Sequence, residues 1–133
     1  MTSNLINVTI SEPIFCLPYV DVPLIAFSAY STDPQIIEVG DVLQFPNFFI
    51  NIGNAYSTNT SSFTCPYTGV YWFQAHLMSL GEDCSAVFVK DELELIGMFA
   101  FGSSIDGIHA SNTIYVDCDE GSKVFRRIFG TSL

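Results

Sequence analysis

The chain has 133 residues, the size of one domain, and its fourteen acidic and four basic residues give it a net charge of −10. Hydrophobic residues make up 49% of the sequence and aromatic residues 14%, which excludes an intrinsically disordered chain. No apolar run reaches the roughly 18 residues that a membrane-spanning helix needs. The negative charge would repel nucleic acid and anionic lipid. We therefore expect a single folded domain that neither inserts into a membrane nor binds nucleic acid.

Turn-forming residues interrupt the chain about every ten residues, and no segment has the period of an amphipathic helix. Short β-forming runs lie between these breaks, so we predict an all-β sandwich or barrel. We predict a hairpin turn at 119–122 and a second turn at 89–93. Residues 1–22 are less regular and suggest an N-terminal arm before one domain at 23–133. In chain order, the predicted strands are 5–10, 24–30, 42–45, 48–52, 62–65, 69–80, 86–89, 93–101, 112–116 and 124–129.

The predicted strand 69–80 has apolar side chains on both of its faces. Tyr71 and Phe73 begin one apolar row, whereas Val70 and Trp72 lie on the opposite side. In an antiparallel sheet of a lone domain, one face normally contacts water. We infer that the second face is covered, either by neighbouring subunits or by a loop or the N-terminal arm.

Four cysteines and two N-glycosylation acceptor patterns, at Asn7 and Asn59, favour a secreted protein in an oxidising compartment. The cysteine spacing does not match a zinc site. We interpret His76 as a structural or rim residue and His109 as a loop residue. Residues 102–106 hold serine and aspartate close to His109 but lack the spacing of a nucleophile elbow, so we expect no enzymatic activity.

A series of aromatic, asparagine and glycine residues at fixed spacing runs through the middle of the chain. It consists of Phe45, Asn51, Tyr56, Phe63, Gly69, Tyr71 and Phe73. This spacing resembles the signature of the complement C1q globular-head family, and the similarity covers about residues 24–129. The segments 26–29, 90–93, 111–112 and 121–124 continue the match.

The resemblance implies a jelly-roll sandwich of the C1q and tumour-necrosis-factor-like type, assembled as a homotrimer. The form without a collagen stalk is similar to invertebrate C1q-domain proteins. Seven aromatic residues would pack in the core or in the contacts of the trimer: Phe27, Phe45, Tyr56, Phe63, Tyr71, Trp72 and Phe73.

The closing strand of the family, which follows a long loop and lies inside a sheet, has no counterpart before Leu133. Its absence would leave backbone groups unpaired. Either the arm strand 5–10 takes its place, or the sheet closes differently, or that segment is missing from this sequence. We predict that the arm is ordered and pairs into the sheet.

The resemblance also implies site residues. Cys65 and Cys84 match the intrachain disulfide of complement members, and Asp106 matches a position where some members place a calcium ligand, although Asp106 is equally a good turn former. Cys16 and Cys118 have no counterpart in the family. They would pair with each other, which we favour, or Cys16 would link subunits.

Most of the basic residues lie together, at Lys123, Arg126 and Arg127. Adjacent residues of a strand face opposite sides, so at most one of the two arginines points fully outward. An outward arginine would bind the carboxylate of an acidic glycan, or it would form a salt bridge within the chain. The acidic partner in that bridge would be Glu38, Asp41 or Asp117.

The expected function is that of a secreted trimeric recognition module, lectin-like and used in innate immunity, which binds glycans or other surface ligands through its loops. Calcium is the one cofactor that the resemblance suggests. Two alternatives remain at this point: a signalling ligand that binds a receptor between subunits, and a structural calcium-binding extracellular protein.

Overall fold

A computed structural model describes residues 7–11, 24–36, 38–80, 83–100 and 107–131. In these ranges the regular structure is entirely β-strand, and no helix there is long and apolar enough to cross a membrane. The strands are β1 (Asn7–Ser11), β2 (Ala26–Tyr30), β3 (Asn47–Ile52), β4 (Tyr56–Ser57), β5 (Ser62–Thr64), β6 (Gly69–Ser79), β7 (Cys84–Lys90), β8 (Leu93–Ala100), β9 (Ile108–Cys118) and β10 (Lys123–Thr131).

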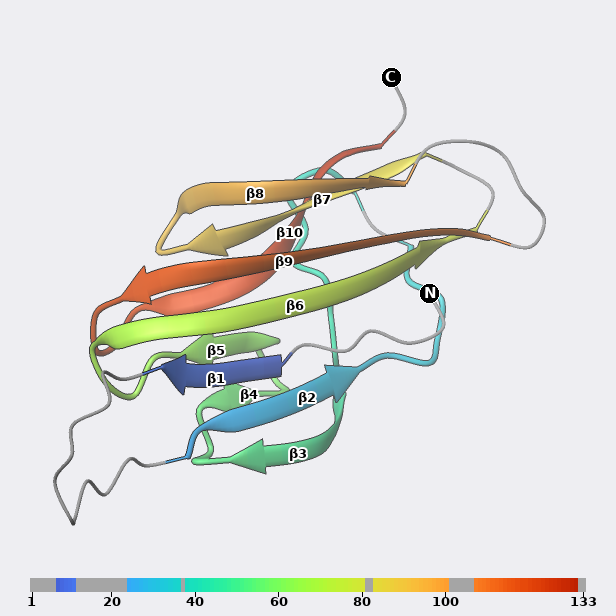
Figure 1. The fold of residues 1–133 in the computed structure, drawn as a ribbon. Coiled ribbons are helices and arrows are strands. Elements are labelled where there is room, and N and C mark those ends of the chain that lie inside the picture. Colours follow the sequence, from blue (N-terminus) through green and yellow to red (C-terminus); the bar gives the residue numbers. More distant parts are fainter. Residues whose placement is uncertain (1–6, 12–23, 37, 81–82, 101–106, 132–133) are drawn as a thin grey trace, which may run out of the picture.

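The strands form two antiparallel layers packed face to face, as a jelly roll requires. One layer has the order β4-β5-β10-β7-β8. The other contains β1-β6-β9 and the pair β2-β3. In Figure 1, β1 lies between β6 and β2, so this front layer runs β9, β6, β1, β2, β3. The predicted all-β jelly roll is therefore the observed fold.

The space between the layers is filled by an aromatic cluster centred on Phe63. Its ring stacks on Phe27 at a centroid distance of 5.2 Å and meets the edges of Tyr71 and Phe73, each at 5.5 Å. Because these rings come from both layers, they join the two sheets. Of the seven aromatic residues expected to pack, six are buried in this core and Trp72 is half-buried.

The Asn51 side chain holds the bend after β3. Its amide Nδ2 donates to the Tyr56 carbonyl at 2.8 Å, and its Oδ1 accepts from the Tyr56 backbone N–H at 3.3 Å. Gly53 lies within this bend at φ +90°, and a Cβ there would collide with Ile25. The spacing of Asn51 and Tyr56 is thus explained by one side-chain clamp across a tight turn.

Several predicted local elements differ in the structure. Residues 119–122 do form a turn, in which the Ser122 N–H donates to the Asp119 carbonyl at 3.0 Å, but it joins β9 of one layer to β10 of the other. The predicted hairpin there is wrong. The turn at 89–93 does join two paired strands, β7 and β8. In the predicted strand 42–45, only Val42 forms a β-bridge, to Arg127.

The arm contributes β1, which pairs antiparallel with β6 in a register that runs from Asn7 opposite Gln74 to Ser11 opposite Val70. The sequence predicted that an arm strand at 5–10 pairs into the sheet without naming its partner; the described part of the arm does so at 7–11. β6 pairs with β9 along its other side. The strand that is apolar on both faces therefore has a paired neighbour on each edge.

Native-state hydrogen exchange tests the pairing of β1. We expect amides of residues 7–11 that donate to β6 to exchange far more slowly than random coil, because opening them requires loss of the β1–β6 ladder. The slow amides should recur at every second residue, as in an antiparallel ladder. Uniformly fast exchange through this segment would contradict the pairing.

Candidate functional site

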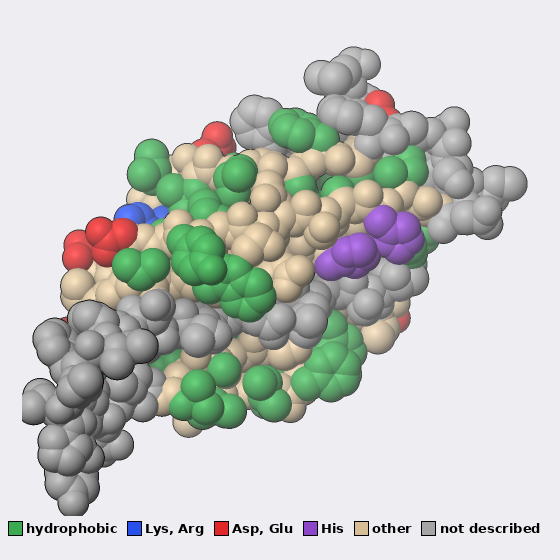
Figure 2. All heavy atoms as spheres, in the orientation of Figure 1, with side chains coloured by type: hydrophobic (Ala, Val, Ile, Leu, Met, Phe, Trp, Pro, Cys, Tyr) green, Lys and Arg blue, Asp and Glu red, His purple; other side chains and the backbone are tan. Residues whose placement is uncertain are grey.

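The outward side of the front layer carries exposed side chains from two paired strands, β6 and β9. We call it the front face and define it by the outward side chains of β6 and β9. They are Val70, Trp72, Gln74 and His76 of β6, with His109, Ser111, Thr113, Tyr115 and Asp117 of β9. Figure 2 shows hydrophobic side chains at its centre and the two histidines near one end.

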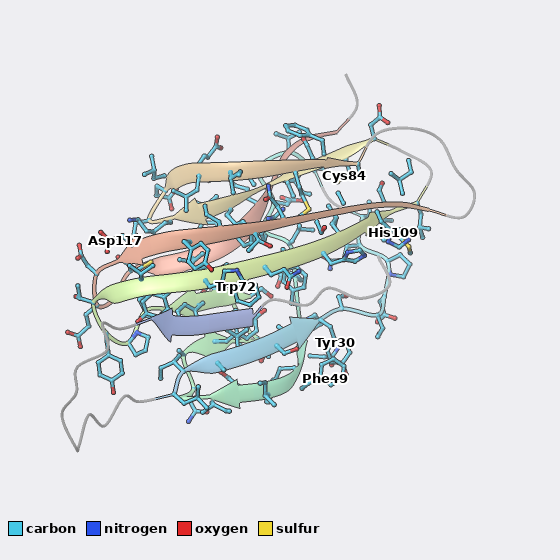
Figure 3. The ribbon with its side chains drawn as sticks, viewed as in Figure 1. Tyr30, Phe49, Trp72, Cys84, His109 and Asp117 are labelled. Atoms are coloured by element: carbon cyan, nitrogen blue, oxygen red, sulfur yellow. The ribbon has the colours of Figure 1, made fainter. Side chains whose placement is uncertain are left out.

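The centre of the front face is aromatic. Trp72 lies directly opposite Tyr115 across the β6–β9 ladder, and the Tyr115 side chain is 71% exposed. Trp72 is half-buried, and Val70 beside it is exposed. Figure 3 shows Trp72 in the middle of this layer. The apolar second face predicted for this strand is thus present, with Val70 and Tyr115 exposed among the described residues.

Apolar side chains also line the edge strand β3. Phe49 is 70% exposed and stacks on Tyr30 at a centroid distance of 4.4 Å, while Phe48, Ile50 and Ile52 are exposed around it. An apolar edge strand that remains in water invites pairing with another chain. At the opposite edge of the sandwich, β8 exposes Leu93, Ile96 and Phe99. Neither edge was singled out by the sequence analysis, because edge positions are set by topology.

The two histidines of the described residues lie side by side at one end of the front face. The Nε2 atom of His76 and the Nδ1 atom of His109 are 3.0 Å apart, and the ring centroids are 5.1 Å apart. His109 lies on β9, so its interpretation as a loop residue is wrong. The two residues are 33 positions apart, and only the β6–β9 register brings them together.

The predicted basic cluster is divided by strand alternation. Arg126 points into the core and is 1% exposed, so it is not available to a ligand in this structure. Arg127 points outward, where its guanidinium donates to Glu94 at 2.9 Å and lies 3.8 Å from Glu92. Lys123 is exposed. The three residues therefore do not form one continuous binding surface, and the acidic partners of Arg127 are not the predicted Glu38, Asp41 or Asp117.

Arg126 is a cation buried between the layers. Its guanidinium lies over the Phe88 ring at 4.2 Å, and its two terminal nitrogens have no hydrogen-bond partner in the described part of the chain. Burial lowers the pKa of Arg126 to about 9, although the nearby Cys84 thiol acts in the opposite direction. Because the charged form is disfavoured in the fold, this arginine opposes folding at neutral pH.

The cysteines are arranged differently from the pairing that the resemblance implied. The structure has Cys65, Cys84 and Cys118 as free thiols, and the side chains of Cys65 and Cys118 hydrogen-bond to each other. This bond is the main reason that the pKa of Cys65 is raised. Cys84 starts β7 near Arg126, toward the opposite end of the sandwich from Asp117, the neighbour of Cys118 (Figure 3).

The pairing of Cys65 with Cys84 is therefore absent, for a topological reason. Cys65 follows β5 and its backbone is bonded to Ser122 and Gly121, which places it beside the end of β9. Burial raises the pKa of the Cys84 thiol. Cys16 lies outside the described residues, as does Asp106, so the pairing of Cys16 and the calcium position stay predictions.

The two glycosylation positions fall on different structures. Asn59 is exposed in the turn between β4 and β5, and Asn7 is the first residue of β1. An exposed turn is accessible to the glycosylation machinery. Of the two, Asn59 has the more favourable setting.

Oxidation of the folded chain tests the cysteine arrangement. With oxidised glutathione as the oxidant, we expect a disulfide between Cys65 and Cys118, because these thiols are already in contact. Peptide mapping without reduction should recover this linked pair. A peptide linking Cys65 to Cys84 would contradict the arrangement.

Replacement of Arg126 tests its energetic role. Arg126→Met should leave the unfolding temperature unchanged or raise it by a few degrees at neutral pH, because it removes a desolvated cation and keeps most of the volume. The pKa of Arg126 is about 9 in the fold, below its value in the unfolded chain. The wild type should therefore gain stability as the pH rises through about 9, and the difference in unfolding temperature between the variant and the wild type should become smaller. A large loss of stability in thermal denaturation would show that the cation stabilises the fold.

Comparisons with known proteins agree with this geometry. The C1q domain family matches residues 26–132. Among solved structures, the globular domain of zebrafish complement 1qA protein superposes with a TM-score of 0.72 at 21% sequence identity, over 80% of this chain and 85% of that one. At that identity the superposition shows the fold, and the family match covers most of the chain. The chain belongs to the C1q domain family.

Proposed function

We propose that this chain is a secreted recognition module that works as a homotrimer and binds glycans or other surface ligands through its loops. The observation that carries the proposal is the set of exposed apolar side chains that the described residues place on the front face and on the two apolar edges. Family membership supports a recognition or ligand module of the C1q and tumour-necrosis-factor-like type.

The energetic argument for assembly rests on exposed aromatic area. Fully burying one large apolar side chain contributes about 1.5–3 kcal/mol. Tyr115, Phe49 and Phe99 each leave half or more of their surface in water in the single chain. A contact between the front face of one copy and the β8 edge of the next would be heterologous, and three such contacts form a closed ring when each relates its two copies by a third of a turn.

Ligand recognition is placed on the loops because the sandwich itself is used for packing. The basic surface is small: Lys123 is exposed, while the charge of Arg127 is partly neutralised by Glu94 and Glu92. An acidic chain with so little accessible positive charge is expected to bind each ligand weakly. Three copies in one assembly strengthen binding to a repeated ligand, such as a glycan-covered surface, through avidity.

A charge at the centre of the front face tests assembly. Tyr115→Arg should convert the assembly to monomers at micromolar concentration in sedimentation velocity, because it places an unpaired cation in each apolar contact. The unfolding of the monomer should change little, since this side chain is mostly exposed. Val39→Arg is the matched control, because Val39 is 61% exposed in the loop between β2 and β3.

The same pair of variants tests recognition on a glycan array. The wild type and Val39→Arg should bind a common set of glycans, and Tyr115→Arg should lose apparent affinity by about 10²-fold or more through lost avidity. If the wild type assembles but binds nothing on the array, glycan recognition is wrong. If Tyr115→Arg stays assembled, Tyr115 does not lie in the contact between copies and the proposed interface is wrong.

A further inference from the structure

We infer that His76 and His109 together form a binding site for a transition-metal ion, such as Zn²⁺, Cu²⁺ or Ni²⁺, at the end of the front face. The observation is the hydrogen bond of 3.0 Å between the Nε2 atom of His76 and the Nδ1 atom of His109. Figure 2 shows the two histidines side by side. Both ligands come from one chain, so the site does not depend on the proposed trimer.

The separation of the two nitrogens matches that of two ligands on one ion. Metal–imidazole bonds of about 2.0–2.1 Å put two nitrogens about 2.9 Å apart at a right angle and about 3.3–3.4 Å apart in a tetrahedral site. The observed 3.0 Å lies between these values. An ion would replace the hydrogen bond between the rings, and both rings would turn so that each nitrogen presents a lone pair to the ion.

The position on the sheet keeps the two rings together. His109 is opposite Met78, so it lies diagonally from His76 across the β6–β9 ladder. Diagonal neighbours on one face are within reach of long side chains. Because both strands are paired along their length, the backbone under each ring is fixed, and little conformational freedom is lost when an ion binds.

The ligand type selects the class of metal. Neutral imidazole suits zinc, copper and nickel, whereas calcium requires oxygen ligands. No cluster of three or more metal-binding side chains occurs in the described ranges, so two protein nitrogens would hold the ion there. Water or a ligand group would fill the remaining positions, which makes the ion weakly held and exchangeable.

The only tryptophan in the sequence reports on this site. Trp72 lies on the same strand and face as His76, four residues away, which is about 13 Å along the strand. Bound Cu²⁺ should quench its emission. Calorimetric titration with Zn²⁺ should give one ion per chain.

Removal of either ligand is the direct test. His76→Gln and His109→Gln should each weaken Zn²⁺ binding at least about tenfold and abolish the Cu²⁺ quenching. Ser111→Ala is the matched control, because Ser111 lies directly opposite His76 and should leave both signals unchanged. Thermal denaturation without metal checks that each variant is folded.

A gain of affinity provides a second test. Ser111→His would bring a third imidazole opposite His76 and two residues from His109 on the same face, so Zn²⁺ binding should tighten at least about tenfold. The inference is overturned if folded His76→Gln and His109→Gln bind Zn²⁺ as the wild type does. It is also overturned if Ser111→His leaves the affinity unchanged.

Discussion

The structure depends on one strand, β6, that must be covered on both of its faces. Its inner row, Tyr71, Phe73, Ala75 and Leu77, is buried against the second layer. Its outer row begins with Val70 and Trp72, and β9 adds Tyr115 beside them. An exposed apolar patch on a sheet face is typical of an interaction surface, and its burial by a second body is favourable. The second layer of the sandwich buries the inner face of β6, and neighbouring copies in the proposed assembly bury the apolar part of its outer face.

The inner cover is an aromatic network rather than a set of independent side chains. Phe63 contacts Phe27 and Tyr71, and the Tyr56 hydroxyl donates to the Phe45 carbonyl at 2.9 Å, so the residues of the family signature meet in one place. Burial raises the pKa of Tyr56 to about 12, so this donor keeps its proton at physiological pH. The recurring spacing in the sequence thus reflects one packed core that connects both layers.

Strand existence and core membership could be predicted because they follow from local alternation. The alternation from Gly69 to Leu77 correctly separated the buried row from the outer row. The pairing of distant residues could not be predicted in this way. His76 meets His109 because β9 lies beside β6, and Cys65 meets Cys118 because its backbone bonds to the turn that follows β9. No local pattern records either arrangement.

The directions of the two arginine side chains could be predicted only in part, because alternation along a strand is local and the order of the layers is not. Alternation requires Arg126 and Arg127 to face opposite sides, but only the layer order decides which one is inside. The result places a desolvated cation in the core and a salt-bridged one on the surface. A ligand site based on charge alone was therefore wrong for Arg126, whereas the apolar face was recognised from a pattern within one strand.

The central claim is that several copies of this chain cover the apolar centre of the front face, at Val70, Trp72 and Tyr115. Light scattering of the unmodified protein at micromolar concentration measures this most directly. We expect a single species of three times the 14.7 kDa chain mass. A stable species with the mass of one chain, which does not aggregate with its apolar face in water, would contradict the account.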